Sequence, residues 1–147
     1  PEDCREMGEL FLDTVRTVNR RDYTEEETKA WAPGLPDLER WNRSFLDHYT
    51  LVAWEDGRIA GFGDIDRTGY LDRLYVGRDF QGRGIATAIC GRLEEHFPVE
   101  RVTVCASITA RPFFEGRGYR VVRSQKVLRR GVYLTNFVME KRLGESD

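Results

Sequence analysis

The sequence contains few residues suited to metal binding or disulfide formation. Only three cysteines and two histidines occur among its 147 residues. Cys4, Cys90 and Cys105 are far apart and show no C-x-x-C spacing, so neither a disulfide framework nor a zinc site is indicated. They are predicted to be reduced, buried thiols in a cytoplasmic protein. With only His48 and His96 available, a His-rich metal site is not expected, and we predict no metal cofactor.

The sequence also lacks long apolar runs and an excess of one charge. No apolar run approaches the roughly 20 residues of a membrane span, and the first residues do not show the pattern expected of a signal peptide. The 23 Lys and Arg residues nearly balance the 25 Asp and Glu residues. The resulting net charge of −2 argues against nucleic acid or an anionic membrane as a partner. With no repeats or linkers, residues 1–147 are predicted to form one domain with its own core.

The sequence does contain alternating helix-like and strand-like patterns. Apolar residues at a spacing of three to four predict a first amphipathic helix, and Thr24 with Glu27 forms a capping box for a second. Asp56-Gly57 and Arg130-Gly131 each join two apolar runs, as in β-hairpins. The predicted class is α+β. Helices are expected within 2–23, 24–34, 35–48, 85–97 and 109–119, and strands within 49–66 (a hairpin), 70–76, 101–107, 120–128 and 132–143.

The stretch QGRGIA, residues 81–86, lies between a predicted strand and a predicted helix. Glycines at this place let the backbone approach a ligand, and the first N–H groups of the helix are unpaired donors, which suits a phosphate or pyrophosphate. Two glycines can equally form an ordinary turn. The stretch is not a P-loop, because GxxxxGK[ST] is absent. It is not a dinucleotide fingerprint either, because Thr87 stands where a third glycine is required.

Placed after the strand Leu74-Tyr75-Val76, the pattern Gln81-x-x-Gly84-x-Ala86 resembles the acyl-coenzyme A loop of the GNAT N-acetyltransferases. The segment RVTVCAS…ARPFFEGRGY is similar to the family's N-x-x-A-x-x-F-Y-E-x-x-G-F segment. The stretches NRRDYTEEE, WAPG and LTNFVMEK resemble the bacterial YafP-like branch. The resemblance implies a mixed, mainly antiparallel sheet flanked by helices. It also implies direct transfer of acetyl from acetyl-CoA to a primary amine of a small molecule or peptide. The family's first strand is expected to be missing or truncated, because Pro1-Glu2-Asp3 already reads as a helix start.

The same resemblance implies which residues hold acetyl-CoA. Main-chain groups at the strand end would bind the pantetheine arm, and backbone amides of the glycine loop would bind the pyrophosphate. Two phenylalanines would pack beside the pantetheine. The implied residues are Leu74, Tyr75, Val76, Gln81, Gly82, Arg83, Gly84, Ile85, Ala86, Thr87, Ser107, Phe113 and Phe114.

Two residues depart from the family pattern. Ser107 stands where the family often has asparagine, and a hydroxyl keeps only part of the hydrogen bonding of an amide. Phe114 occupies the place of a tyrosine that protonates the leaving thiolate in many relatives, and phenylalanine has no proton to give. Another group or solvent must then serve, since a thiol pKa of about 8.5 makes the thiolate a fair leaving group. These departures leave a second function open, a module that binds acyl-CoA without efficient transfer.

Three residues are candidates for the chemistry at the amine. If residues 67–69 form a three-residue turn, strand alternation places Asp64 and Asp66 on one sheet face with Asp72 and Tyr70. Acyl transfer to an amine needs a base that takes up the amine's proton. We predict that Asp72 is this base, directly or through water, that Asp64 orients the cation, and that Tyr70 matches the position of a basic glutamate in some relatives. The alternative is that these carboxylates are ordinary solvated strand residues.

Other polar and aromatic residues have plainer interpretations. His48 is interpreted as a surface residue and Cys105 as an inert thiol, while Tyr119 and Tyr133 are interpreted as packing residues. The basic residues of 117–130 alternate with apolar ones and lack the aromatic platform of a nucleic-acid site, so they are predicted to form a solvated face. A homodimer is compatible with the sequence. The three tryptophans are either core residues or the roof of an acceptor pocket (Trp31, Trp41 and Trp54).

Overall fold

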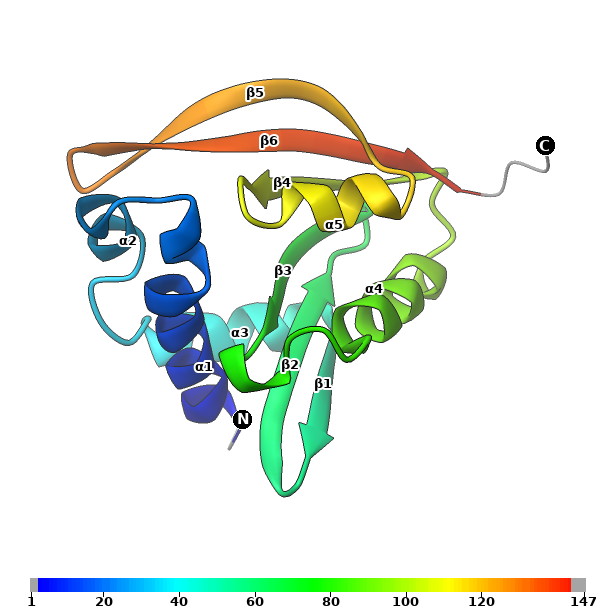
Figure 1. Cartoon of the computed structure of the whole chain (residues 1–147). Coiled ribbons are helices and arrows are strands. Elements are labelled where there is room, and N and C mark those ends of the chain that lie inside the picture. The colour runs from blue at the N-terminus through cyan, green and yellow to red at the C-terminus, as the bar shows by residue number, and fades with distance from the viewer. Residues whose placement is uncertain (1–2, 144–147) are drawn as a thin grey trace.

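The computed structural model of the protein describes residues 3–143. Its helices are α1 (Cys4–Thr17), α2 (Glu25–Trp31), α3 (Leu38–Asp47), α4 (Ile85–His96) and α5 (Arg111–Gly116), with the 3-10 turns η1 (Asn19–Arg21) and η2 (Arg78–Phe80). Its strands are β1 (Tyr49–Glu55), β2 (Arg58–Ile65), β3 (Tyr70–Val76), β4 (Arg101–Ser107), β5 (Arg120–Arg129) and β6 (Val132–Arg142) (Figure 1). No helix of this described part is long and apolar enough to cross a membrane.

The strands form one sheet in the order β1-β2-β3-β4-β6-β5. Each neighbouring pair is antiparallel except β3–β4, which is parallel. The predicted α+β class with a mainly antiparallel sheet is therefore confirmed. Within the described residues the first element is helix α1, and no strand precedes it, as the sequence predicts.

Local sequence signals explain where the chain turns. Asp56 and Gly57 have φ angles of 53° and 75°, and Arg130 and Gly131 have φ angles of 48° and 81°. Two consecutive positive φ angles form the tight turn whose twist matches antiparallel strands, which is why glycine closes both hairpins. At the start of α2, the side chain of Thr24 accepts a hydrogen bond from the backbone of Glu27, and the Glu27 carboxylate accepts one from the backbone of Thr24. The predicted capping box is therefore present.

Helices cover both faces of the sheet (Figure 1). Helices α1 and α3 pack on one face around Phe62, and α4 packs on the other face around Ile65 and Leu71. Complete burial of such a side chain stabilises the fold by about 1.5–3 kcal/mol. The sheet is thus the middle of three layers, and β3 and β4, which form the site described below, are held by packing on both sides. The largest fully buried apolar side chains include Phe62, Ile65, Leu71, Leu93, Val102 and Met139.

A buried ionic cluster ties α4 to the α5–β5 connection and to β6. The Glu94 carboxylate accepts hydrogen bonds from Arg117 Nη2 at 2.5 Å and from the Tyr119 hydroxyl at 2.7 Å, and Lys141 Nζ lies 3.5 Å away. Burial raises the pKa of Glu94, but these hydrogen bonds and positive charges together outweigh burial and hold it below its usual range. Tyr119 is buried here, in agreement with its predicted packing role, whereas Tyr133 is exposed.

Candidate active site

The parallel strands β3 and β4 separate along their length. They pair only at Tyr70 with Thr103 and at Leu71 with Val104. Beyond these residues β3 stays paired with β2, and β4 stays paired with β6. A cavity between the separated ends, which we call the strand gap, is lined mainly by residues 71–75 and 104–107. The main chain of β3 that faces the gap has no partner strand there.

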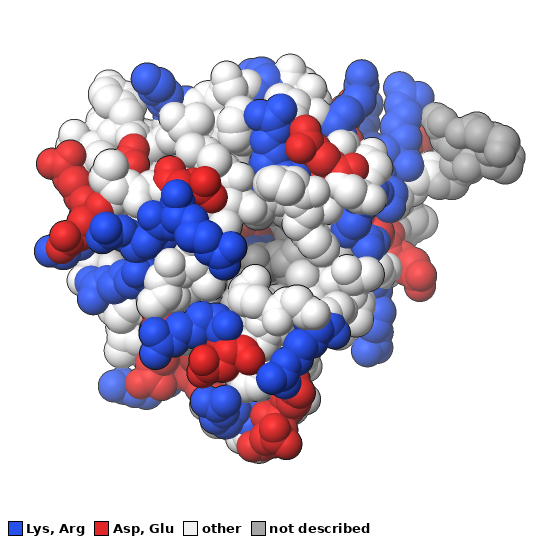
Figure 2. Space-filling view, viewed as in Figure 1, with Lys and Arg blue, Asp and Glu red and all other residues white. Residues whose placement is uncertain are grey.

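A first pocket opens at one side of the strand gap, between α1, β3 and α5. This front pocket has a volume of about 170 Å³. Figure 2 shows the same face of the molecule hollowed near its centre, with Lys and Arg side chains around the hollow. Two hydroxyls that line the front pocket, Thr14 Oγ1 and Thr109 Oγ1, are buried and have no hydrogen-bond partner among residues 3–143. Eight of the predicted cofactor residues line the pocket: Leu74, Tyr75, Val76, Gln81, Ala86, Ser107, Phe113 and Phe114.

The glycine loop presents free backbone amides beside this pocket. Gly82 and Gly84 have φ angles of 74° and 80°, and Gly84 begins α4 as a left-handed cap with no side-chain cap bond. Within the described chain, no backbone N–H group of residues 82–87 donates a hydrogen bond to a protein acceptor; the first intrahelical bond runs from the Ala88 amide to the Gly84 carbonyl. These amides lie at the positive end of the helix dipole and can bind an anion.

Two side chains of the same loop bind other parts of the protein and hold the loop in place. Gln81 Nε2 donates to the Val76 carbonyl at 2.6 Å, which ties the loop to the end of β3. Arg83 Nη1 lies 2.6 Å from Glu55 Oε1, so this guanidinium is paired with the β1–β2 hairpin. Any anion held by this loop would therefore be held chiefly by main-chain donors.

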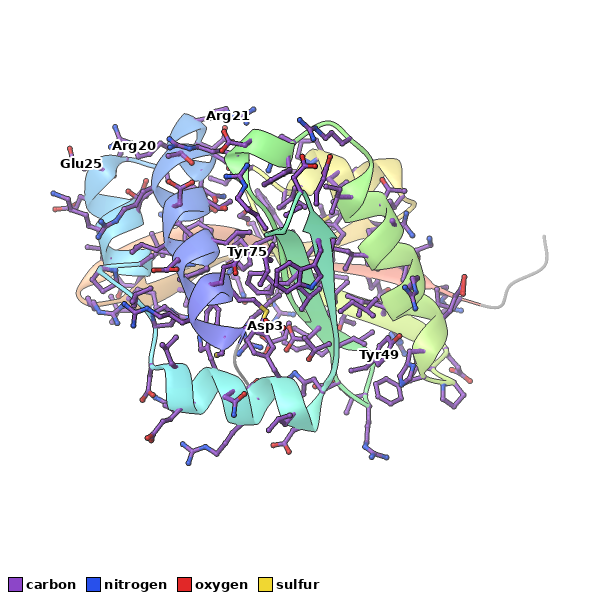
Figure 3. The ribbon with its side chains drawn as sticks, turned by 90° about the horizontal axis from the view of Figure 1, so that it is seen from below. Asp3, Arg20, Arg21, Glu25, Tyr49 and Tyr75 are labelled. Carbon is purple, nitrogen blue, oxygen red and sulfur yellow. The ribbon has the colours of Figure 1, made fainter. Side chains whose placement is uncertain are left out.

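A second pocket lies beneath the β5–β6 hairpin. This hairpin pocket has a volume of about 200 Å³, and Asp72 and Arg129 are its charged lining residues. It shares Tyr75 and Ser107 with both the front pocket and the strand gap. In Figure 3 Tyr75 lies between α1 and the sheet, and its ring packs edge-on against Phe11 with centroids 5.0 Å apart. The three cavities therefore meet at the place where β3 and β4 separate.

A charged cluster borders the junction on the β2–β3 side. Asp64 is completely buried, and its Oδ2 accepts a hydrogen bond from Arg73 Nη1 at 2.5 Å and lies 2.8 Å from His48 Nδ1. Burial raises the pKa of Asp64, and the Arg73 charge and the His48 hydrogen bond offset only part of this effect. Arg73 also lies over the ring of Phe45, 4.6 Å from its centroid. Asp64 therefore positions His48 and Arg73 and is itself closed to a substrate.

The cluster also has the donor atoms of a metal site. Ligand atoms of His48, Asp64 and Asp72 lie within 4.8 Å of one another. However, Arg73 Nη1 lies 2.5 Å from Asp64 Oδ2 and 3.5 Å from Asp72 Oδ2. The guanidinium already supplies a positive charge to both carboxylates, so a metal ion would have to displace it.

Asp64 and Asp72 lie near each other as predicted, but through a different register. Asp64 faces Arg73 and Ile65 faces Leu71, so Asp72 is the extra residue of a β-bulge. The Asp72 side chain is 32% exposed and forms no hydrogen bond with the described residues, and it lines both the hairpin pocket and the strand gap. Its carboxylate is therefore the accessible acid at the junction.

Asp66, which was predicted to share this face, lines none of the described cavities. Asp66 Oδ1 accepts hydrogen bonds from the Thr68 backbone, the Thr68 hydroxyl and the Tyr70 backbone, at 2.9, 2.6 and 3.1 Å. The carboxylate is used to close the β2–β3 turn, as aspartate commonly does in turns. Asp66 is therefore not part of the pocket.

Two further predictions need correction. His48 is not a surface residue, because its side chain is only 18% exposed and lies against Asp64. Cys105 is exposed rather than buried, unlike Cys4 and Cys90. It lines the hairpin pocket beside Tyr70, whose pKa is raised by burial and by this neighbouring thiol, so the Tyr70 hydroxyl stays protonated. Cys105 is exposed because side chains alternate along β4: the side chains of Val104 and Ala106 point into the core, so that of Cys105 points to the pocket.

Two of the three tryptophans have the predicted roles, and Trp54 has neither. Trp31 lines the hairpin pocket and the strand gap, Trp41 packs in the α1–α3 core, and Trp54 is exposed. Phe113 lines the front pocket, and Phe114 is almost fully buried between the core, that pocket and the gap. The Ser107 hydroxyl accepts a hydrogen bond from the Ala110 backbone at 3.0 Å, which helps close the turn before α5.

Several residues of the site were not identified from the sequence. Arg73 was not identified because only the β-bulge places it opposite Asp64. Arg129 was predicted to lie on a solvated face, but it lines the hairpin pocket. Asn136 lines the hairpin pocket with a buried Oδ1 that has no hydrogen-bond partner in the described part of the chain, and Thr14 comes from α1, far away in sequence. No local pattern marks Thr14 or Asn136, because only the tertiary fold brings them to a cavity.

Comparison with known proteins places these observations in a family. Residues 19–141 match the family described as "Acetyltransferase (GNAT) domain", and the chain therefore belongs to the GNAT acetyltransferases. It is 34% identical to the uncharacterized N-acetyltransferase YafP of Escherichia coli (strain K12), over 95% of this chain and 89% of that protein. Acetyl-CoA is the co-substrate that membership in this family implies.

Solved structures agree with the fold. A GCN5-related N-acetyltransferase from Rhodopseudomonas palustris has a TM-score of 0.92 at 31% identity, with 97% of this chain and 91% of that chain covered. The PaiA N-acetyltransferase from Thermoplasma acidophilum, solved in complex with coenzyme A, has a TM-score of 0.73 at 18% identity, with 96% and 93% covered. The second likeness shows the fold alone.

Proposed function

We propose that the protein transfers the acetyl group of acetyl-CoA directly to a primary amine of a small molecule or peptide. The observation that carries this proposal is the meeting of two pockets at the strand gap. One pocket adjoins a loop of free backbone amides, and the other contains an accessible carboxylate. Direct transfer requires donor and acceptor to approach each other at one point, and the gap between β3 and β4 provides it.

The donor would enter from the front pocket. In this proposal the amides of residues 82–87 bind the pyrophosphate, and the pantetheine arm lies along the unpaired main chain of Leu74–Val76 with Phe113 beside it. The thioester would then reach the strand gap near Asp72 and Cys105, where β3 and β4 begin to separate. Tyr75 and Ser107, shared by all three cavities, would border the acetyl group.

The free hydroxyl of Thr109 gives a first test of the donor pocket. Thr109 Oγ1 is buried without a partner, and the pantetheine arm carries amide groups that could supply one. Thr109→Val should therefore raise the KM for acetyl-CoA several-fold, the loss of one hydrogen bond of about 0.5–1.5 kcal/mol. The free energy of unfolding should not fall, because no hydrogen bond within the protein is lost. Steady-state kinetics and urea unfolding measure the two effects, and an unchanged KM would contradict this role.

The chemistry at the amine can be assigned to Asp72. An ammonium group bound at the junction gives its proton to the Asp72 carboxylate, and the neutral nitrogen attacks the thioester carbonyl. A C–N bond forms, the C–S bond breaks, and the products are the acetamide, coenzyme A and one proton. Asp64 acts through Arg73 and His48, which it holds beside Asp72, and is a positioning residue. The Tyr70 hydroxyl, kept protonated by its surroundings, lies in the same pocket.

The leaving thiolate would be protonated by solvent. Phe114 has no proton to donate and lies almost fully buried at the front pocket. A free thiol has a pKa of about 8.5, so its thiolate leaves readily near neutral pH without a dedicated acid. The absent tyrosine thus does not exclude turnover.

The second candidate function is an acyl-CoA-binding module without efficient transfer, which Ser107 and Phe114 favour. Release of free thiol from acetyl-CoA, measured against a panel of primary amines, separates the two. We expect amine-dependent thiol release together with acetylated product in mass spectra. Tight coenzyme A binding without release for any amine would instead support the binding module.

A further inference from the structure

The hairpin pocket carries one negative and one positive side chain at different positions. Asp72 lies at the strand gap, and Arg129 lies near the turn of the β5–β6 hairpin, which extends over α2 (Figure 1). The remaining lining residues are uncharged. Arg73 Nη1 approaches Asp72 Oδ2 to 3.5 Å from outside this pocket, so within the lining Asp72 is the anionic group and Arg129 the cationic one. This arrangement favours a molecule with opposite charges at its own ends.

The strand register indicates how far apart these charges are. Cys105, beside Asp72 in the gap, pairs with Val138 of β6, whereas Arg129 pairs with Val132. Six residues of a strand span about 20 Å, and the curvature of the hairpin and the long Arg129 side chain shorten the distance between the charged groups. In register the two positions are thus six residues of β6 apart, whereas the amine and carboxylate of an α-amino acid share one carbon.

Arg129 is available to a ligand. Its guanidinium donates one hydrogen bond, to the Leu128 carbonyl at 3.1 Å, and forms no ion pair within residues 3–143. Two other basic residues near the site already have partners: Arg73, beside Asp72, binds Asp64, and Arg130, beside Arg129, donates to the Ala30 carbonyl at 2.7 Å. Arg129 is thus the pocket cation without an anionic partner, and guanidinium groups bind carboxylates and phosphates well.

Asn136 supports an amine at the opposite end. Its Oδ1 is buried, unpartnered and part of the pocket lining. A carbonyl oxygen can only accept hydrogen bonds, and leaving it buried and unsatisfied is unfavourable. Asn136 pairs in register with Ser107, so it lies at the end of the pocket where the three cavities meet. An ammonium group there could donate to both Asp72 and Asn136.

We infer that the acceptor is a small amine that also carries a carboxylate or phosphate several bonds from its nitrogen. Asp72 and Asn136 receive the ammonium group, and Arg129 binds the anionic group. This inference rests on the proposed acetyltransferase function and specifies its acceptor. Peptides with an uncharged side chain next to the amine, simple alkylamines and diamines would be poorer acceptors.

The test compares acceptors that differ only in the anionic group. The kcat/KM of ε-aminocaproate is measured beside that of the corresponding amino alcohol, with γ-aminobutyrate and alanine as shorter amino acids. We expect the kcat/KM of ε-aminocaproate to be about tenfold higher than that of the amino alcohol, which is the effect of one charge-assisted hydrogen bond of roughly 1.5 kcal/mol. Among the amino acids, alanine should have the lowest kcat/KM. A ratio near one for the wild type would overturn the inference.

Variants of Arg129 locate the effect. Arg129→Met should bring the ratio of the kcat/KM for the acid to that for the alcohol close to one, and Arg129→Glu should reverse the preference. Arg123→Met is the matched control, because Arg123 lies on the same strand, is exposed and lines none of the described cavities. Equal losses for both acceptors in Arg129→Met would overturn the assignment.

The outcome can be separated from failure of the proposed function. If no amine releases thiol from acetyl-CoA, the acetyltransferase proposal fails, and binding of ε-aminocaproate to the coenzyme A complex is measured directly by calorimetry. If Arg129→Met weakens this binding about tenfold, the inferred class of ligand is supported even though the acetyltransferase proposal has failed. Absence of binding, or binding that ignores Arg129, would overturn it.

Discussion

Gly84→Asp should weaken coenzyme A binding at least a hundredfold. Gly84 begins α4 with a φ angle of 80°, and a Cβ built on it meets no atom within 4 Å. An added carboxylate would therefore project into the open space in front of the free amides of residues 82–87. At about 4 Å, two like charges near a protein surface repel by roughly 4 kcal/mol, and the pyrophosphate carries more than one charge.

The matched control for this variant is Gly84→Asn. Asparagine has nearly the same size as aspartate and adopts the left-handed conformation comparably well, so both variants share the backbone cost of about 1–2 kcal/mol. They differ only in charge. Calorimetric titration with coenzyme A should show a modest loss for asparagine and a large loss for aspartate, with similar melting temperatures. Equal affinities for the two variants and the wild type would show that the loop does not hold the diphosphate.

The architecture could be predicted well because its signals are local. Gly57 and Gly131 adopt positive φ at little cost and so mark the turns of two hairpins. The capping box of Thr24 and the apolar stripe of α1 likewise depend on neighbours within one or two turns of helix. Each signal acts over a few residues, so one sequence is sufficient to place the elements.

The site could be predicted from the sequence only where its residues lie close together along the chain. The front pocket contains eight residues that the family pattern had indicated, because the loop and the strand before it are contiguous. The opposite wall of the site depends on long-range register. The bulge at Asp72 pairs Asp64 with Arg73 rather than with Asp72, and a shift of one residue changes which side chains share a face.

Packing decides the remaining roles. His48 directly precedes β1 and gives no sequence signal, yet the pairing of Tyr49 with Ile65 brings it beside the buried Asp64. Cys105 could have been placed from the sequence, because the inward residues Val104 and Ala106 flank it on β4. Alternation along the strand would therefore have placed Cys105 correctly. At Asp72 it gave the wrong cross-strand partner for Asp64, because the β-bulge shifts the register.

Asp72→Asn should lower kcat by about 10²–10⁴-fold near neutral pH, the usual contribution of a positioned base. Asp72 is the accessible carboxylate at the junction of the three cavities, and asparagine keeps its shape but cannot take up a proton. The KM for acetyl-CoA should stay close to that of the wild type, because Asp72 does not line the front pocket. Asp56→Asn, at the remote β1–β2 turn, is the matched control and should behave as the wild type.

The pH profile distinguishes a base from a residue that only shapes the pocket. Without Asp72, only acceptor molecules whose amine is already neutral in solution can react. For an alkylamine with a pKa of about 10.4, the neutral fraction increases tenfold with each pH unit as long as the pH is below the pKa. The rate of Asp72→Asn should therefore rise steeply with pH, and its deficit against the wild type should shrink. Initial rates at saturating acetyl-CoA measure this directly. A deficit that stays constant at every pH would mean that Asp72 positions the amine but does not take its proton, and no deficit would remove it from the site altogether.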